Sequence, residues 1–392
     1  MIIKNIYPES WAFCDNPILV YLDGQDLTYR IKKGDVIHFT GHGDGAFTVN
    51  IADIVSAAMP TDREMPAETI DGTCIRQRDD LPIEFTVEAV DGDGNREQGS
   101  VQVWPGGIAM SDYRALRLQE DTAFFHRFTN YSSNFLLTTR TADWILPIRE
   151  TELEPLAFVL SGARTNTVVI RDELYGEVYH YNIEDNCLTT LDLDNLRRYI
   201  FDEEGHLSNV FTIGISIPLP QSTKVVWGVR VVITPAEVSR QRCLVRYVNS
   251  LGVYERIDLT GTVTVNTSGQ DGEDAIYKHY DEKTDSFLRQ RDRQALAQSY
   301  TIKTGLLPRW ERNALLDMIA SDEVWLIMPD GLPLRVIPSV ETLPMPRRPE
   351  QPESFEVTFT PQEDLLLASV GNMEGKVYPP QVFNSRFTSV FE

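Results

Sequence analysis

Residues 83–104 read IEFTVEAVDGDGNREQGSVQVW, and this stretch decides the fold class. From 83 to 89, apolar residues at the odd positions alternate with polar residues at the even positions. Because successive side chains of a strand point to opposite faces, the alternation predicts a strand with one buried and one solvated face. The Gly- and Asp-rich segment 91–95 then predicts a hairpin loop that leads to a strand containing Val101 and Val103.

The same period of two recurs before this hairpin. Residues 18–22 and 27–31 flank Asp23-Gly24-Gln25-Asp26, and the second run alternates in polarity, which predicts a further hairpin with its turn at 23–26. Residues 47–51 repeat the pattern, and the Pro-Gly-Gly segment at 105–107 predicts the end of the unit. Short strands separated by turn signals are typical of an antiparallel sandwich of about 100 residues.

Strand patterns dominate the rest of the chain, and amphipathic spacing predicts helices at 111–128 and 308–320. We therefore predict a mainly β fold: multidomain antiparallel β-sandwich units with two short α-helices packed on them. The expected domains are an N-terminal β-sandwich at 1–108, a helix plus β-sandwich domain at 109–236, a β domain with one amphipathic helix at 237–343, and a Pro-rich connector, last strand and C-terminal arm at 344–392.

Composition narrows the classes of function. The chain has 392 residues and a formal net charge of −22, a balance that opposes binding to a phosphate backbone. The sequence contains no apolar run long enough for a membrane helix, and its first residues lack the apolar region of a signal peptide. The four cysteines lie far apart with no CxxC pair, which predicts reduced, buried thiols and neither a disulfide framework nor a zinc knuckle.

Three local patterns resemble catalytic or metal sites only in part. His38 and His42 are four apart, but strand patterning at 36–39 would separate them by about 13 Å, so a strand-end loop at 41–45 is favoured over a metal site. Residues 91–95 resemble the start of a calcium loop, yet its sixth and twelfth positions are Arg and Gln. Ser216 lies in strand alternation, outside a GxSxG elbow. We expect no catalytic, cofactor-binding or metal-binding residues, and no enzyme.

Aromatic residues near the two ends of the chain form the candidate site. They lie in segments with weak periodicity, where apolar side chains usually dock against other protein surfaces. The predicted assembly contacts are Trp11, Phe13, Phe383, Phe387 and Phe391.

Several segments resemble a family of phage proteins. FLLTTR at 135–140 and PIRETELEPLAF at 147–158 are similar to a segment of uncharacterised virion structural proteins of Bacteroidales phages and prophages. RYVNSLG at 246–252 and SDEVWL at 321–326 are similar to a later part of the same proteins. The resemblance spans roughly residues 105–340 and implies a tail or baseplate role. It carries over no active-site residues, since its motifs belong to the fold.

Together these observations predict a non-enzymatic structural subunit of a phage tail or tail-like particle. Its expected partners are further copies of itself in a cyclic homo-oligomer and other virion tail proteins, without sequence-specific nucleic acid and without membrane insertion. We expect it in the virion tail after assembly in the cytoplasm of the bacterial host. The alternative is a host-surface or glycan-binding β-sandwich module that acts through exposed aromatic residues.

Overall fold

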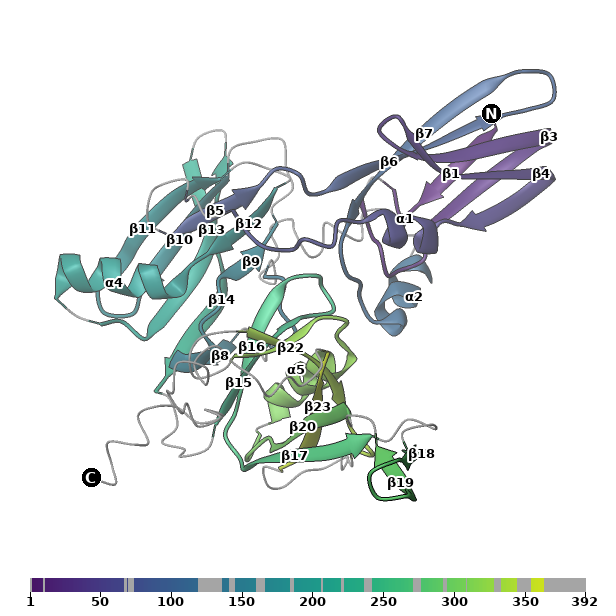
Figure 1. The fold of residues 1–392 in the computed structure, drawn as a ribbon. Coiled ribbons are helices and arrows are strands. Elements are labelled where there is room, and N and C mark those ends of the chain that lie inside the picture. The colour runs from purple at the N-terminus through teal and green to yellow at the C-terminus, as the bar shows by residue number, and fades with distance from the viewer. Residues whose placement is uncertain are drawn as a thin grey trace. The chain divides into compact units, whose positions relative to one another are not determined.

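The computed structural model divides the chain into two compact units (Figure 1). Unit 1 comprises Met1–Pro235 and Val248–Glu255, and unit 2 comprises Ala236–Tyr247 and Arg256–Glu392. The structure describes residues 2–9, 11–66, 69, 74–118, 136–140, 145–159, 166–183, 187–205, 207–219, 222–235, 242–270, 276–291, 295–307, 309–327, 333–343 and 354–362.

Unit 1 begins with a six-stranded sheet in the order β1-β3-β6-β7-β2, to which β4 is added beside β3. Its strands are β1 (Ile3–Tyr7), β2 (Trp11–Phe13), β3 (Leu19–Lys33), β4 (Val36–Asn50), β6 (Ile83–Val90) and β7 (Arg96–Trp104), and helix α1 (Ala52–Ala58) follows β4. The predicted hairpin at 83–104 is confirmed, because β6 and β7 pair antiparallel from Ile83–Val103 to Val90–Arg96. Its alternating residues Phe85 and Val87 are fully buried in the core.

Two segments expected as a turn and a loop are parts of long strands. Residues 23–26 lie inside β3 and residues 41–45 inside β4, so both predictions are wrong. The polar segments lie opposite each other, with Gly24 paired to Gly45 and a bulge before the next pair. Because both strands continue together past the bulge, their polar residues form an exposed two-stranded ribbon.

The glycines of β4 leave room for aromatic rings. A Cβ atom on Gly41 would lie 2.3 Å from the ring of Tyr29, and one on Gly43 would lie 2.3 Å from the ring of Phe47. A ring packed over a glycine covers backbone that would otherwise weaken the strand. This packing explains why a glycine-rich segment stays extended.

The second part of unit 1 contains a five-stranded sheet in the order β11-β10-β13-β14-β8. Its strands are β8 (Ile145–Arg149), β10 (Asn166–Asp172), β11 (Gly176–Ile183), β13 (Val210–Leu219) and β14 (Ser222–Thr234). A small antiparallel sheet joins β5 (Ile75–Arg78), β12 (Leu188–Leu191) and β9 (Leu156–Phe158). Strand β5 falls within the predicted domain 1–108 but pairs with β12, so this unit is built from segments far apart in sequence.

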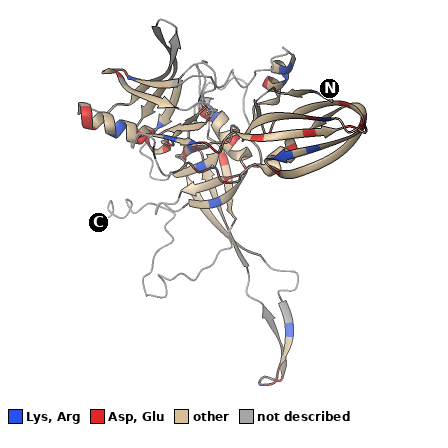
Figure 2. Cartoon of the chain, turned by 90° about the horizontal axis from the view of Figure 1, so that it is seen from above, with Lys and Arg blue, Asp and Glu red and all other residues tan. Residues whose placement is uncertain are grey.

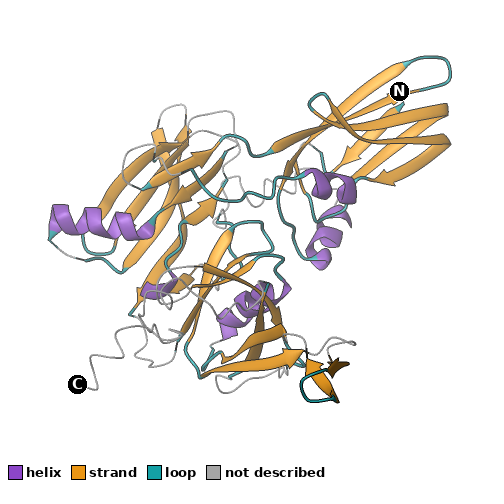
Figure 3. Cartoon of the chain, viewed as in Figure 1, coloured by secondary structure: helices purple, strands orange, loops and turns teal. Residues whose placement is uncertain are grey.

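Four α-helices lie in the described part of the chain, two more than expected (Figure 3). The predicted helix at 111–128 is α2 (Met110–Leu118) as far as the structure describes it, and the one at 308–320 is α5 (Arg309–Ala320). The helices α1 and α4 (Leu193–Glu204) were not predicted. Local signals do explain α4: Asp192 caps its first turn and Gly205 ends it in a left-handed conformation.

Unit 2 is a seven-stranded sheet packed with α5, in the order β16-β15-β21-β22-β23-β20-β17. Its strands are β15 (Cys243–Val248), β16 (Tyr254–Leu259), β17 (Val263–Gln270), β20 (Ala295–Lys303), β21 (Val324–Ile327), β22 (Pro333–Ser339) and β23 (Glu356–Pro361). A separate hairpin, β18 (Ile276–Asp281) and β19 (Ser286–Arg291), lies in sequence between β17 and β20. The mainly β multidomain fold is confirmed. No described helix is long and apolar enough to cross a membrane.

Candidate interaction surfaces and the buried charged cluster

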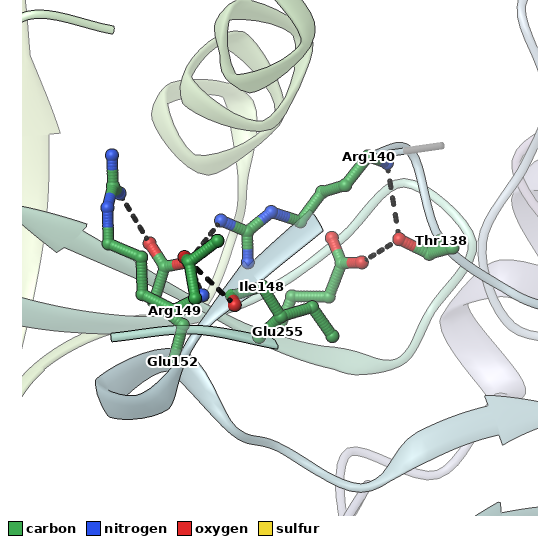
Figure 4. Close-up of polar contacts among 7 residues, drawn as sticks. Thr138, Arg140, Ile148, Arg149, Glu152 and Glu255 are labelled. Atoms are coloured by element: carbon green, nitrogen blue, oxygen red, sulfur yellow. Dashed lines mark hydrogen bonds and ion pairs between the residues drawn. The ribbon is translucent and has the colours of Figure 1, made fainter. Parts of the chain in front are cut away.

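A buried carboxylate holds two arginines together in unit 1 (Figure 4). The carboxylate of Glu152 accepts hydrogen bonds from Arg140 Nη2 at 2.8 Å and Arg149 Nη1 at 3.0 Å. It also accepts one from the backbone N–H of Arg149 at 3.1 Å, which fixes the short 3₁₀ turn Glu150–Glu152. The Glu152 side chain is fully buried and both arginines are at least nine-tenths buried. Buried charges of this kind are retained only where they are paired and hydrogen-bonded.

The neighbouring contacts of this cluster come from the tip of the β15–β16 hairpin. The hydroxyl of Thr138 donates a hydrogen bond to the carboxylate of Glu255 and accepts one from the backbone N–H of Arg140 (Figure 4). Buried Asn249 donates from its amide to the carbonyl of Leu137 at 3.0 Å and accepts from two backbone N–H groups of its own loop. These contacts join two segments of unit 1 that lie more than 100 residues apart in the sequence.

Two glycines allow the same loop to approach the segment that follows β7. Gly106 and Gly252 have φ angles of 85° and 82°, and a Cβ atom on either would lie 2.5–2.7 Å from backbone atoms of the other segment. The N–H of Gly107 donates to the carbonyl of Ser250 at 2.6 Å. Only glycine suits both the positive φ and the close contact. The Pro-Gly-Gly segment therefore forms a packing contact as well as ending the N-terminal sheet.

The segments that carry the resemblance to phage proteins supply most of these contacts. Thr138 and Arg140 belong to FLLTTR, Arg149 and Glu152 to PIRETELEPLAF, and Asn249 to RYVNSLG. In this arrangement the carboxylate is saturated by donors and holds loops in place. The spacing of Arg149 and Glu152 was visible in the sequence, but no local pattern indicates that Arg140 or Glu255 lies nearby.

The predicted N-terminal assembly contacts lie within the fold of the chain itself. Trp11 and Phe13 form β2, which pairs in parallel with β7, so the expectation of an irregular segment is wrong here. The Trp11 ring stacks on Trp104 with centroids 5.8 Å apart, and Phe13 is 1% exposed. The Phe13 side chain therefore packs against its own chain. Phe383, Phe387 and Phe391 lie outside the described residues.

Strand β4 presents the longest exposed sheet edge of the N-terminal sheet. It pairs with β3 over 15 residues and has no second partner strand among the residues that the structure describes. Near its start, Val36 is 60%, Ile37 48% and Phe39 38% exposed. An exposed strand edge offers unpaired backbone groups to another chain, and apolar side chains on it add to that tendency. We define residues 36–50 as the β4 edge.

A second exposed apolar group lies at the tip of the β18–β19 hairpin. Tyr280 and Phe287 face each other across this hairpin with ring centroids 5.4 Å apart, and Phe287 is 72% exposed. The hydroxyl of Tyr280 donates to the carboxylate of Asp285, which fixes one ring at the turn. Exposed aromatic groups of this kind mark interaction sites.

The outer face of the N-terminal sheet carries charges of both signs (Figure 2). Glu88 was expected on the solvated face of its strand, yet its side chain is 5% exposed because three cations cover it. These are Lys32, Arg96 with its Nη2 at 2.8 Å, and Arg30 with its Nη1 at 3.7 Å. The hydrogen bond from Lys32, with the cations beside it, lowers the pKa of Glu88. This group ties β3, β6 and β7 together on their outer face.

The partial metal motifs of the sequence serve as strand and turn elements. His42 lies within β4 and contacts the hydroxyl of Thr28 through Nδ1 at 3.0 Å. Asp91 accepts hydrogen bonds from the backbone and side-chain nitrogens of Asn95, each at 2.8 Å, and so closes the turn between β6 and β7. In the described ranges, no three His, Cys, Asp or Glu side chains are grouped as metal ligands would be.

None of the four cysteines forms a disulfide. Cys14, Cys74 and Cys187 are buried, as expected, while Cys243 is partly exposed. Burial raises the pKa of Cys14 to about 12 and that of Cys243 to about 12. Such thiols are poor nucleophiles at neutral pH.

Comparison with known proteins adds little. No protein-family model matches the chain, and no curated protein matches it. A structure giving insight into host cell surface retention of a 1.5-MDa bacterial ice-binding adhesin is 9% identical, with a TM-score of 0.15, and the alignment covers 74% of this chain and 93% of that one. A structure from work on Dscam isoform specificity is 8% identical, with a TM-score of 0.16, covering 76% and 69%. Both TM-scores are too low to carry an argument about function.

Proposed function

We propose that this chain is a non-enzymatic structural subunit of a phage tail or tail-like particle that acts through protein–protein contacts. Its partners would be further copies of itself in a ring and other virion tail proteins. The observation that carries the proposal is the β4 edge, because an exposed strand of 15 residues is a ready surface for pairing with another chain.

The resemblance to virion proteins of Bacteroidales phages supports the choice of a tail. Its motifs supply the buried cluster around Glu152 and the loop around Asn249, and both hold the fold together. Motifs that serve packing suit a subunit whose work is to present surfaces. The location that follows is the virion tail, after assembly in the cytoplasm of the host.

A second candidate function rests on the hairpin tip. Tyr280 and Phe287 expose their rings side by side, an arrangement that suits binding of a host-surface glycan through stacking on an aromatic face. This function would need no ring and no tail partner. It predicts binding by a single copy of the chain.

Negative-stain electron microscopy of the purified full chain tests the first proposal. The sample is imaged at low and at physiological salt, since the charge of −22 repels copies at low ionic strength. The screening length falls from about 30 Å at 0.01 M salt to about 8 Å at 0.15 M. Rings or tubes at the higher salt support a tail subunit.

If neither rings nor tubes form at any salt concentration, the tail proposal is overturned. A glycan array then tests the second candidate with the wild-type chain and the Tyr280→Ala/Phe287→Ala variant. Binding that the double substitution abolishes, with thermal stability unchanged, would assign the chain to glycan recognition. An array without binding would remove that candidate.

A further inference from the structure

The sequence of the β4 edge nearly mirrors itself about Gly43. Reading outward from Gly43, the equivalent positions hold His42 and Asp44, Gly41 and Gly45, Thr40 and Ala46, and Phe39 and Phe47. In two antiparallel strands related by a two-fold axis, each residue faces the residue at its mirrored position in the other copy. We propose that two copies of this chain pair antiparallel through residues 39–47 of β4, with the two-fold axis at Gly43.

The strand is open to such pairing. In the described part of the molecule β4 pairs with β3 along one edge only, and its residues are exposed or half-buried throughout. The pairing of β3 with β4 contains a bulge between Gly24 and Leu27. The extra residue of this bulge lies on β3, so β4 has no inserted residue there. The second irregularity, near His38, lies outside the proposed segment. A nine-residue stretch of β4 is therefore available to a partner strand.

The side chains match when the strands are paired in this way. Phe39 of each copy faces Phe47 of the other copy, so the pairing contains two aromatic pairs. Directly opposed aromatic residues stabilise a strand pair. On the other face, His42 lies opposite Asp44 of the second copy, again twice. Within its own chain His42 contacts Thr28 through Nδ1, and Asp44 accepts the N–H of Asp26 through Oδ1 at 3.3 Å. Each contact uses one polar atom of the side chain, so His42 Nε2 and Asp44 Oδ2 can meet across the axis.

The glycines fix the position of the axis. Gly45 has a left-handed backbone with φ of 70°, a kink that would obstruct a side chain on the facing strand. With the axis at Gly43, this kink faces Gly41 of the second copy, where there is no side chain. With the axis at His42, Phe39 would face Gly45 and His42 would face itself. The observed order of residues therefore favours one register.

The pairing concerns the free chain and does not depend on the tail proposal. It closes at two copies and covers an edge that would otherwise promote aggregation. A dimer without rings would leave this inference standing while the tail proposal fails. Rings whose contacts do not involve β4 would overturn this inference, and the tail proposal would then rest on a contact other than the β4 edge.

Sedimentation equilibrium of the full-length chain at physiological salt measures the pairing. We expect a monomer–dimer equilibrium in the wild type. His42→Asp places carboxylates opposite each other at both ends of the axis and should weaken dimerisation by roughly tenfold or more. His42→Asp/Asp44→Lys places opposite charges at the facing positions and should recover dimerisation.

The matched control is His180→Asp, the same substitution at an exposed histidine of β11, the edge strand of another sheet. It should leave the dimer unchanged. Thermal melting confirms that each variant is folded. A wild type that stays monomeric up to its solubility limit, or a double variant no better than His42→Asp, would overturn the proposal.

Cross-linking tests the register independently of affinity. Thr40 faces Ala46 of the second copy, and facing residues of antiparallel strands have Cα atoms about 4.5–5.5 Å apart, within reach of a disulfide. Thr40→Cys/Ala46→Cys should give a covalent dimer on mild oxidation with oxidised glutathione. Either single variant and the wild type should not. A covalent dimer from Thr40→Cys alone, or none from the double variant, would contradict the axis at Gly43.

Discussion

Replacing Glu152 by Gln should destabilise unit 1 strongly. The substitution keeps the size of the side chain but removes the negative charge between Arg140 and Arg149, which are 4% and 9% exposed. Breaking a buried ion pair by removing one partner costs about 3–5 kcal/mol, since the other charge is left uncompensated. For a unit of this size, 1 kcal/mol shifts the melting temperature by about 2–4 °C, so we expect a loss of roughly 6–20 °C.

Differential scanning calorimetry measures this effect as a shift of the melting temperature. The matched control is Glu173→Gln, which breaks the exposed ion pair of Glu173 with Arg230 in the same unit. Exposed pairs contribute about 0–1 kcal/mol, so this variant should melt within a few degrees of the wild type. If the Glu152→Gln and Glu173→Gln variants had the same melting temperature, the view that the buried cluster holds unit 1 together would be refuted.

Three further predictions follow from other contacts. Gly106→Ala should destabilise the chain more than Gly176→Ala in urea unfolding: both glycines have positive φ, but a Cβ atom clashes with backbone only at Gly106. Glu88→Gln should lower the melting temperature at pH 7, and the difference should vanish in acid. The lowered pKa of Glu88 means that its stabilisation is complete above the unfolded value of about 4.3 and disappears as the pH falls through the folded value. Cys14 should react with a thiol reagent at pH 8 only after unfolding, because it is buried and burial raises its pKa to about 12, and rapid labelling of Cys14 in the native chain would contradict this.

The sequence predicts those parts of the fold that depend on local alternation. Phe85 and Val87 are buried as their period of two indicated, and α5 lies within one residue of its expected start. The continuity of β4 through its glycines could not be predicted in this way. It depends on the rings of Tyr29 and Phe47, and one of these belongs to another strand.

The contacts of the buried cluster could likewise be predicted only in part from the sequence. Arg149 and Glu152 are three residues apart and their contact is local, but Thr138 meets Glu255 only because a hairpin closes 117 residues later. No periodicity in either segment indicates that meeting. The candidate surfaces were missed for a related reason, since exposure of the β4 edge depends on which strands of the finished sheet lack a second neighbour.

The tip of the β15–β16 hairpin has a consequence for the order in which the protein folds during synthesis. Residues 248–255 belong to unit 1, although they follow its other residues by a dozen positions and interrupt unit 2. Domains generally fold as units as the chain leaves the ribosome. Here the donor of Asn249 and the acceptor of Glu255 arrive after the rest of unit 1 has been translated. The contacts of Leu137 with Asn249 and of Thr138 with Glu255 can therefore form only after the ribosome has begun to translate unit 2.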